Sequence, residues 1–198
     1  MIAIIDYKAG NVASVKNALD RLGVKSLITS KPSEVLAADG VIFPGQGRAG
    51  SAIKELQRTR LDQAIPQISK PFLGICLGMQ LLADFSDEDR IDCLGIISGR
   101  CRKFPAIVKS PQLGWNKVAF EQNSPLTEDI KSGEYFYFVH SYYFDAAPEA
   151  VIGTTNYGFS FPSIVRHDNF FAVQFHPEKS GPAGERLLKN FCEVSQCL

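Results

Sequence analysis

The sequence predicts an α/β fold with a mostly parallel central sheet flanked by helices and a mixed or antiparallel β extension. Over the first half, short apolar runs alternate with amphipathic segments at helical spacing, which is typical of a parallel sheet covered on both faces. From Gly95 to Phe175, short β-rich runs separated by turn residues replace this pattern. The 198 residues contain no repeat, linker or low-complexity tract, so we expect residues 1–198 to form a single domain.

Each predicted element of the first half has a local signal. The strands are apolar runs that end at turn residues, and they cover 2–5, 26–29, 40–43 and 71–75. The helices have apolar residues at every third or fourth position, over 12–22 and around 53–65. The dipeptide Gly10-Asn11 marks the turn before the first helix, and Gly23 ends that helix.

The second part is expected to extend the same sheet. Its predicted strands are runs rich in aromatic and β-branched residues, over 135–144, 151–155, 163–165 and 170–175. A final helix over 183–194 would place Leu187, Leu188 and Phe191 on one apolar face.

Charge and hydropathy argue against two classes of partner. Lys plus Arg and Asp plus Glu number 21 each, so no overall positive field would attract phosphate backbones. The apolar runs are far too short to span a bilayer, and residues 1–6 lack the pattern of a signal peptide. We therefore expect neither nucleic acid nor membrane as a partner.

The five cysteines are odd in number and scattered, with no C-x-x-C pair. This distribution argues against a disulfide framework and against a zinc site. We expect free thiols in a reducing cytoplasm, and no metal.

The segment 72–82 carries the strongest chemical signal. An apolar strand runs into a helix through Cys76, with Gly74 and Gly78 two residues away on either side. This is the layout of a nucleophile elbow with cysteine in place of serine, in which the glycines clear space beside a sharply turned backbone. A helix N-terminus beside the thiol would favour the reactive thiolate. The alternative is that Cys76 is a buried core cysteine.

A cysteine nucleophile requires a base and a group that orients the base. His176 lies at the carboxyl end of the strand 170–175, where open α/β sheets place their chemistry. Glu178 follows two residues on, and in extended backbone the two side chains would project to the same side. His140 also ends a strand and is the rival base, whereas His167 lies in a polar turn.

Together, residues 74–80 (Gly-Ile-Cys-Leu-Gly-Met-Gln) and 175–178 (Phe-His-Pro-Glu) resemble the motifs of the class I, triad-type glutamine amidotransferases, whose fold is flavodoxin-like. Within that family, four further segments look like the glutaminase subunits of imidazole glycerol phosphate synthase: 6–11, 114–116, 137–143 and 176–181. The resemblance covers essentially the whole chain. It implies a Cys76-His176-Glu178 triad that hydrolyses L-glutamine through a glutamyl thioester, without a cofactor.

The resemblance also implies a partner and further site residues. Ammonia would pass to a separate cyclase subunit in a heterodimer, which forms imidazole glycerol phosphate and an aminoimidazole carboxamide ribonucleotide in histidine biosynthesis. The implied oxyanion-hole residues are Gly45, Gln46, Gly47 and Leu77. The implied substrate-binding residues are Gln80, Ser141 and Tyr142. The implied interface residues are Asn11, Trp115, Tyr137 and Lys179, although Trp115 and Tyr137 could instead be core aromatics.

Two positions depart from the family pattern. Gln46 stands where the oxyanion loop usually has valine, and Gln112 stands where a histidine usually precedes the Gly-Trp-Asn segment. Three other functions stay open. They are the glutaminase subunit for pyridoxal phosphate or anthranilate synthesis, a non-catalytic scaffold of the same fold, and a stand-alone γ-glutamyl peptidase.

Overall fold

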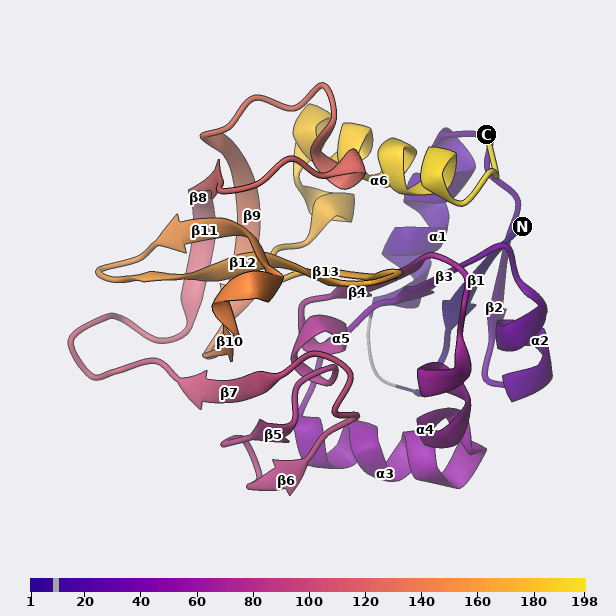
Figure 1. The fold of residues 1–198 in the computed structure, drawn as a ribbon, viewed down its shortest axis with the longest axis horizontal. Coiled ribbons are helices and arrows are strands. Elements are labelled where there is room, and N and C mark those ends of the chain that lie inside the picture. The colour runs from indigo at the N-terminus through magenta and orange to yellow at the C-terminus, as the bar shows by residue number, and fades with distance from the viewer. Residues whose placement is uncertain (9–10) are drawn as a thin grey trace.

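The computed structural model describes residues 1–8 and 11–198 (Figure 1). Ala9 and Gly10, and with Gly10 part of the predicted Gly10-Asn11 turn, lie outside the described residues. The strands are β1 Ile2–Ile5, β2 Ser26–Thr29, β3 Gly40–Phe43, β4 Phe72–Ile75, β5 Phe85–Ser86, β6 Ile91–Asp92, β7 Gly99–Lys103, β8 Gln112–Phe120, β9 Glu134–His140, β10 Tyr142–Ala146, β11 Val151–Asn156, β12 Ser160–His167 and β13 Phe170–Val173. The helices are α1 Val12–Arg21, α2 Pro32–Ala37, α3 Ala49–Thr59, α4 Leu61–Ala64, α5 Leu77–Gln80 and α6 Gly181–Val194, with 3-10 turns η1 Ile65–Gln67, η2 Pro125–Thr127, η3 Pro148–Ala150 and η4 Pro177–Lys179.

Within this part of the chain, nine strands form one large sheet in the order β2-β1-β3-β4-β13-β12-β11-β8-β9. The strands from β2 to β13 are mutually parallel. The strands from β12 to β9 continue the sheet in antiparallel pairs. The predicted fold class, a mostly parallel sheet with an antiparallel extension, is confirmed.

Helices cover both faces of the parallel half. Alternate residues of β1 enter opposite layers, because successive side chains of a strand point to opposite faces. Ile2 and Ile4 pack in the cluster that contains Leu19 of α1 and Phe191 of α6. Ala3 and Ile5 pack in the other cluster, which holds buried side chains of α2, α3 and α4. The continuous apolar runs of the sequence therefore correspond to strands buried on both sides.

The structure corrects the prediction of one strand over 135–144. The chain leaves the large sheet after β9, and Ser141 separates it from β10, which belongs to a second sheet of order β10-β7-β5-β6. β10 pairs antiparallel with β7, from Tyr142 opposite Lys103 to Ala146 opposite Gly99. A continuous β-rich run in sequence cannot show that its two halves pair with different strands.

The segment around 53–65, predicted as one helical pattern, forms two helices in the structure. Arg60, with φ of 60°, separates α3 from α4, so the apolar positions belong to two helices. Short helix α2 and strands β5 to β7 were not predicted, because their apolar patterns are too short to show a period.

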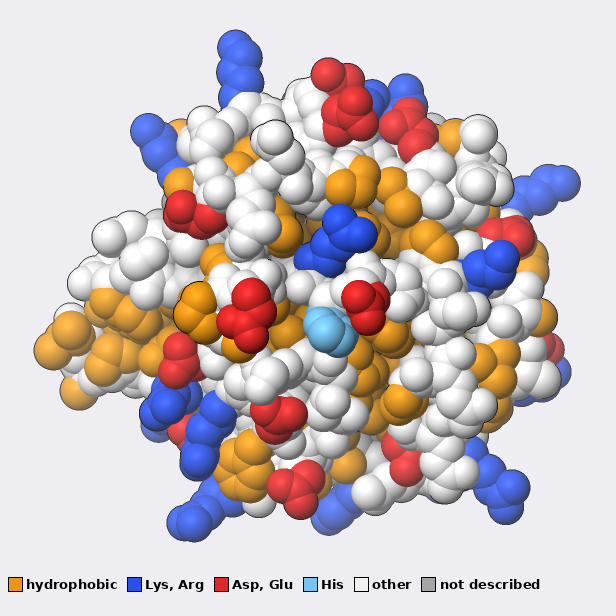
Figure 2. All heavy atoms as spheres, viewed as in Figure 1, with side chains coloured by type: hydrophobic (Ala, Val, Ile, Leu, Met, Phe, Trp, Pro, Cys, Tyr) orange, Lys and Arg blue, Asp and Glu red, His pale blue; other side chains and the backbone are white. Residues whose placement is uncertain are grey.

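One face of the molecule carries side chains of both charges. Figure 2 shows Lys, Arg, Asp and Glu side chains interspersed over one face, without a continuous basic area. Among the described residues, no helix combines the length and the apolarity that crossing a membrane would need.

Candidate active site

Cys76 lies between the end of β4 and the start of α5. Its φ of 54° and ψ of −107° are unusual for a residue with a side chain, so the backbone is strained there. The Cys76 N–H donates to the carbonyl of Val173 at 2.8 Å, which fixes the turn against β13. A strained, strand-to-helix cysteine is the geometry predicted for the nucleophile elbow.

The flanking glycines are needed for space. A Cβ on Gly78 would lie 2.0 Å from the Phe43 carbonyl oxygen, and a Cβ on Gly74 would lie 2.8 Å from the Gly78 carbonyl oxygen. Neither backbone neighbour can move without disturbing β3 or the elbow. The prediction that only residues without side chains fit beside Cys76 is confirmed for both positions.

The helix that follows Cys76 is short. α5 contains four residues, which is about one turn. The helix-dipole support for a thiolate that the sequence suggested is correspondingly small, because the macrodipole grows with the number of aligned peptides. Side chains and backbone N–H groups around the sulfur must supply more of that support.

The predicted oxyanion loop packs directly against the elbow. A Cβ on Gly45 would lie 2.4 Å from the Gly78 nitrogen and 2.5 Å from the Leu77 Cβ. Gly47 has φ of 112°, a conformation that favours glycine. Gln46, Gly47 and Leu77 line the same pocket as Cys76, whereas Gly45 is buried beneath the loop.

His176 and Glu178 form a buried pair. The His176 Nδ1 atom lies 2.9 Å from Glu178 Oε1, and the two side chains are 2% and 1% exposed. Burial alone lowers the pKa of His176, but the neighbouring Cys76 and Glu178 groups outweigh burial and raise that pKa to about 10. The Nε2 atom is buried and lacks a hydrogen bond of good geometry among the described residues, so it is available to the nucleophile or to a substrate.

The contact was predicted, but its backbone explanation was wrong. His176 is extended, with φ of −101° and ψ of 94°, while Pro177 and Glu178 lie in the 3-10 turn η4. The carboxylate therefore reaches the imidazole across the start of a helical turn and not along an extended strand. The Ser180 hydroxyl donates to the His176 carbonyl at 2.6 Å and helps to hold this turn.

His140, the rival base, lies in a different environment. Its Nδ1 atom is 2.7 Å from the Tyr142 carbonyl oxygen, and its ring packs on Phe104 with centroids 5.0 Å apart. Burial lowers the pKa of His140 to about 4. No carboxylate contacts the ring in the described part of the chain, so the imidazole is held neutral.

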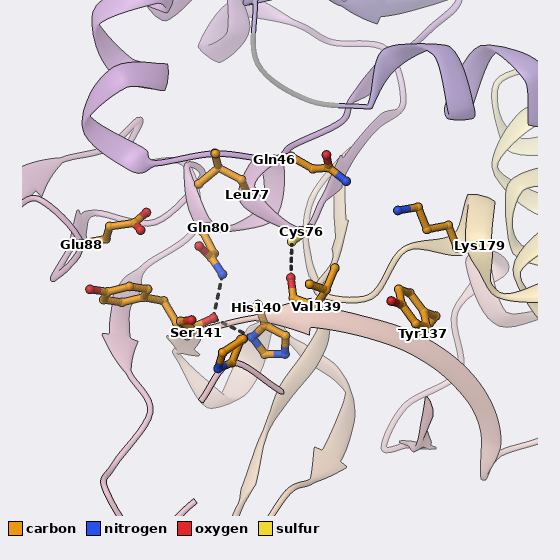
Figure 3. A pocket seen from close by; sticks show the side chains of 13 residues that line it. Gln46, Cys76, Leu77, Gln80, Glu88, Tyr137, Val139, His140, Ser141 and Lys179 are labelled. Carbon is orange, nitrogen blue, oxygen red and sulfur yellow. Dashed lines mark hydrogen bonds between the residues drawn. The ribbon is translucent and has the colours of Figure 1, made fainter. Parts of the chain in front are cut away.

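These elements surround a pocket of about 420 Å³ (Figure 3). Figure 3 shows Cys76 and Gln80 facing Val139, His140 and Ser141 across it, with Tyr137 and Lys179 at one end and Glu88 at the other. Its lining residues come from the predicted oxyanion loop, the elbow, the chain between β9 and β10, and three additional positions, Glu88, Pro111 and Lys179. They are Gln46, Gly47, Cys76, Leu77, Gln80, Glu88, Pro111, Tyr137, Val139, His140, Ser141, Tyr142 and Lys179.

A hydrogen bond joins two of the predicted substrate residues, Gln80 and Tyr142. The Gln80 amide donates to the Tyr142 carbonyl at 2.7 Å, which ties α5 to the crossing between the two sheets. His140 bonds the same carbonyl through Nδ1. Gln80, Ser141 and Tyr142 thus all line the pocket, with Gln80 on the side of Cys76 and Ser141 opposite it.

Sequence reasoning missed two buried or partly buried polar groups of the site. Glu88 lines the pocket and accepts from the Ala49 N–H at 2.9 Å, and burial raises the pKa of its carboxyl. It lies in a polar stretch with no distinguishing pattern. Gln174 donates to Cys76 Sγ at 3.6 Å, and a polar residue within an apolar strand sequence was the available signal.

The predicted interface residues divide into three positions. Trp115 is 52% exposed, so the core-aromatic alternative is wrong for Trp115. The centroid of its ring lies 5.9 Å from that of Tyr137. The Lys179 ammonium nitrogen also lies 5.9 Å from the centroid of the Tyr137 ring. Tyr137 and Lys179 line the pocket, whereas Asn11 lies at the start of α1 and outside it.

All five cysteines lie in the described part of the chain. Cys76, Cys93, Cys101, Cys192 and Cys197 are all free thiols. In residues 1–8 and 11–198, no group of three or more His, Cys, Asp or Glu side chains is placed to hold a metal ion.

Comparisons with known proteins match this geometry. The family model "Glutamine amidotransferase class-I" matches residues 3–194. The imidazole glycerol phosphate synthase subunit HisH of Methanocaldococcus jannaschii is 48% identical over 198 residues, covering 98% of this chain and 100% of that protein. The HisH subunit of Dehalococcoides mccartyi is 45% identical over 200 residues, covering 98% of each chain.

Solved structures share the fold at lower sequence identity. A glutamine amidotransferase crystal structure has a TM-score of 0.77 at 20% identity, covering 99% of this chain and 100% of that one. The structure of PurLQS from Thermotoga maritima has a TM-score of 0.73 at 18% identity, covering 97% of each chain. The chain therefore belongs to the class-I glutamine amidotransferases, the enzyme family of the HisH subunits of imidazole glycerol phosphate synthase.

Proposed function

We propose that this chain hydrolyses L-glutamine as the glutaminase subunit of imidazole glycerol phosphate synthase, with Cys76, His176 and Glu178 as its triad. The observation that carries the proposal is the strained Cys76 elbow beside a buried His176–Glu178 pair. Near-full-length relatives with that name support the choice of synthase.

In the first step, the Cys76 thiolate attacks the side-chain amide carbon of glutamine and a carbon–sulfur bond forms. Because its pKa is raised, the His176 ring is protonated, and Nε2 can deliver a proton to the departing nitrogen. The carbon–nitrogen bond breaks, ammonia leaves and a glutamyl thioester remains. Glu178 orients the ring through Nδ1 and stabilises its positive charge.

In the second step, water hydrolyses the thioester. His176, now neutral, accepts a proton from the water as the oxygen attacks the thioester carbon. The carbon–sulfur bond breaks, glutamate leaves, and the thiolate–imidazolium pair is restored. Both tetrahedral intermediates carry an oxyanion that needs N–H donors.

We assign those donors to the Leu77 N–H and to the loop of Gly45, Gln46 and Gly47. The packing of Gly45 on the elbow supports this assignment, since it brings the loop backbone against Leu77. Backbone donors do not depend on the side chain, so glutamine at position 46 is compatible with the role. One such donor contributes roughly 3 kcal/mol to transition-state stabilisation.

The pocket wall offers groups for the amino-acid end of glutamine. Gln80, Ser141 and Tyr142 lie at the pocket surface, and we assign them to hold the α-amino and α-carboxylate groups. Glu88 lies at the end opposite Lys179, where its carboxylate suits an ammonium group. An anchored amino-acid end would leave the side-chain amide near Cys76.

We further propose that a cyclase subunit binds over the pocket and receives the ammonia in a heterodimer, where it forms imidazole glycerol phosphate and the aminoimidazole carboxamide ribonucleotide. Trp115, Tyr137 and Lys179 form an aromatic and basic cluster beside the pocket, and such residue types anchor interfaces. Asn11 would contribute from the start of α1. Docking there would cover the ammonia exit.

The nucleophile is tested by Cys76→Ser in the complex with the cyclase subunit. Glutamine-dependent product formation should be lost, because a hydroxyl is a far poorer nucleophile than a thiolate, while ammonia-dependent product formation persists. Cys197→Ser, at a free thiol outside the pocket, is the matched control and should retain both activities. Glutamine-dependent turnover by Cys76→Ser would remove Cys76 from its role.

The partner coupling is tested with Lys179→Ala. The His176 N–H donates to the Tyr137 carbonyl at 2.9 Å and the Lys179 N–H to the His176 carbonyl at 3.0 Å, so interface residues adjoin the triad backbone. We expect glutamate formation to be weak for the isolated chain, to rise strongly with cyclase and its nucleotide substrate, and to rise less in Lys179→Ala.

Lys117→Ala is the matched control, because Lys117 lies over the Tyr135 ring at 5.4 Å but does not line the pocket. Full activity of the isolated wild-type chain would contradict the coupling and favour the stand-alone hydrolase alternative. Equal activation of wild type and Lys179→Ala would show that Lys179 takes no part in the coupling, and would leave the coupling itself in place.

A further inference from the structure

Besides the neighbouring His176 imidazole, whose pKa the Cys76 group raises, the Cys76 sulfur has the Gln174 amide as a side-chain hydrogen-bond donor in the described structure. The Nε2 atom of Gln174 lies 3.6 Å from Cys76 Sγ. Gln174 is completely buried and follows β13, two residues before His176. Burying an amide is unfavourable unless its polar atoms are paired, so the contacts that pair it are informative.

The other end of the same amide is paired with a substrate-binding side chain. Gln174 Oε1 accepts from Gln80 Nε2 at 3.0 Å, and Gln80 Nε2 also donates to the Tyr142 carbonyl at 2.7 Å. A continuous polar chain therefore joins the nucleophile to the pocket wall, through Gln174 and Gln80.

The charge of the nucleophile fixes the direction of this chain. A thiolate accepts hydrogen bonds and has no proton to donate, so Gln174 must present its nitrogen to the sulfur. Its oxygen then faces Gln80, which must present its own nitrogen. Both Gln80 amide hydrogens are used by Gln174 and Tyr142, and Gln80 Oε1 remains as an acceptor.

The other contacts of the sulfur increase the importance of this donor. Cys76 Sγ lies 3.8 Å from the Val139 carbonyl oxygen, an acceptor that suits a thiol but repels a thiolate. The four-residue helix α5 offers only a small dipole. The ionised sulfur therefore depends on side chains, and the Gln174 amide adds a neutral donor to the charge of the His176 imidazolium.

We infer that Gln174 is a positioning residue of the glutaminase: its amide stabilises the Cys76 thiolate through one end and fixes the orientation of Gln80 through the other. The inference rests on the proposed role of Cys76. The thiolate state of the nucleophile and the shape of the substrate wall are thereby coupled through one buried side chain.

The test is the pH dependence of Cys76 alkylation by iodoacetamide in the full chain, followed by mass spectrometry of the Cys76 peptide. In Gln174→Met the midpoint of this profile should move to higher pH, because the donor is lost while an unbranched side chain still fills the space. In Gln174→Glu the shift should be larger, because a carboxylate would face the sulfur. With the cyclase bound, kcat/KM for glutamine should fall about tenfold or more in Gln174→Met, as expected for a lost hydrogen bond to a charged group.

Asn190→Leu is the matched control, since Asn190 is a buried amide whose Nδ2 bonds the carbonyls of Leu126 and Glu128 away from the pocket. It should lower stability and leave the alkylation profile unchanged. An unshifted profile in folded Gln174→Met or Gln174→Glu, or an equal shift in Asn190→Leu, would overturn the inference. If wild-type Cys76 itself showed no enhanced reactivity below the pH of an ordinary thiol, the proposed nucleophile would fail instead.

Discussion

The turn after β13 and the end of β9 each hold a buried histidine near Cys76. The pKa of the imidazole is raised in the first region and lowered in the second. At His176, the neighbouring Cys76 group and the Glu178 carboxylate, which accepts from Nδ1, raise the pKa to about 10. At His140, a backbone carbonyl takes the same position and the pKa falls to about 4. Both Nε2 atoms are buried without a hydrogen bond of good geometry to described residues. Burial therefore does not determine whether a histidine is charged; the charge of its partners does.

The surroundings of His140 reinforce its neutrality. Its ring centroid lies 5.0 Å from that of Phe104, 5.7 Å from Phe138 and 5.5 Å from Phe161. Aromatic rings exclude water and offer no counter-charge to stabilise an imidazolium. A neutral ring that holds the Tyr142 carbonyl is suited to shape the pocket, whereas a charged ring beside a thiolate is suited to transfer protons.

The largest expected effect is on turnover in His176→Ala. In the complex, kcat/KM for glutamine should fall by about a hundred-thousandfold or more, because the group that donates and accepts the proton is gone. His140→Phe should cost about tenfold, the effect of one hydrogen bond to the pocket wall. Steady-state kinetics with both variants decides between them, and the reverse order would make His140 the base.

The next effect is expected from Glu178→Gln. Loss of the carboxylate should lower kcat by about a hundredfold to ten-thousandfold, because the imidazolium loses its orienting charge. The pKa of His176 should also fall below about 10, by the part of the rise that Glu178 contributes, while Cys76, the larger cause, remains. An NMR titration of the histidine rings measures this, and an unchanged His176 pKa would mean that the carboxylate does not stabilise the charged ring.

The two histidines should also affect stability with opposite signs. The folded-state pKa of His140, about 4, lies below its ordinary value of 6.5, so the unfolded chain binds more protons between these values and stability falls as pH drops from 6.5 towards 4. The full difference corresponds to about 3 kcal/mol. The raised pKa of His176 acts in the other direction: its stabilisation is present below pH 6.5 and is lost as pH rises towards 10.

Urea unfolding at a series of pH values measures both limbs. His140→Phe should flatten the acid limb and leave the alkaline limb in place, while His176→Ala should do the opposite. An acid limb of unchanged slope in His140→Phe would show that other groups cause it.

The smallest effect is expected at Gln112, opposite His140 in the β8–β9 pair. Its Nε2 donates to Asn116 Oδ1 at 2.8 Å, but its Oε1 is buried without a partner in the described structure. In Gln112→Leu, removal of the unpaired acceptor should offset the lost hydrogen bond, so the free energy of unfolding should change by less than about 1.5 kcal/mol. A larger loss in chemical denaturation would indicate that Gln112 has a partner of greater importance.

The sequence was most informative where chemistry depends on local backbone. The spacing of Gly74, Cys76 and Gly78 predicted an elbow that the φ of 54° at Cys76 bears out. His176 and Glu178 were paired correctly because they are two residues apart. The reason given, extended backbone, was wrong because Pro177 starts a 3-10 turn.

Contacts between residues far apart in the chain could not be predicted from the sequence. Glu88 and Gln174 reach the site from segments whose partners lie 39 and 98 positions away, at Ala49 and Cys76. The division of 135–144 between two sheets likewise depends on pairing with β7 and β8, which no periodicity reveals. The roles assigned to the oxyanion, substrate and interface residues stay predictions for the experiments above.

The position of β13 sets an order of events during synthesis. It lies between β4 and β12 in the sheet, but it is made after both, and the parallel and antiparallel halves cannot join until it inserts. The Cys76 N–H pairs with Val173 and the Cys76 sulfur with Gln174, so the nucleophile acquires these partners only at that moment. A ribosome-bound chain whose residues 170–178 have not yet emerged should therefore hydrolyse no glutamine. Glutaminase assays on stalled nascent chains of increasing length measure this. The segment that completes the large sheet thus also brings Gln174, His176 and Glu178 to Cys76, so closing the sheet and assembling the candidate site are one event.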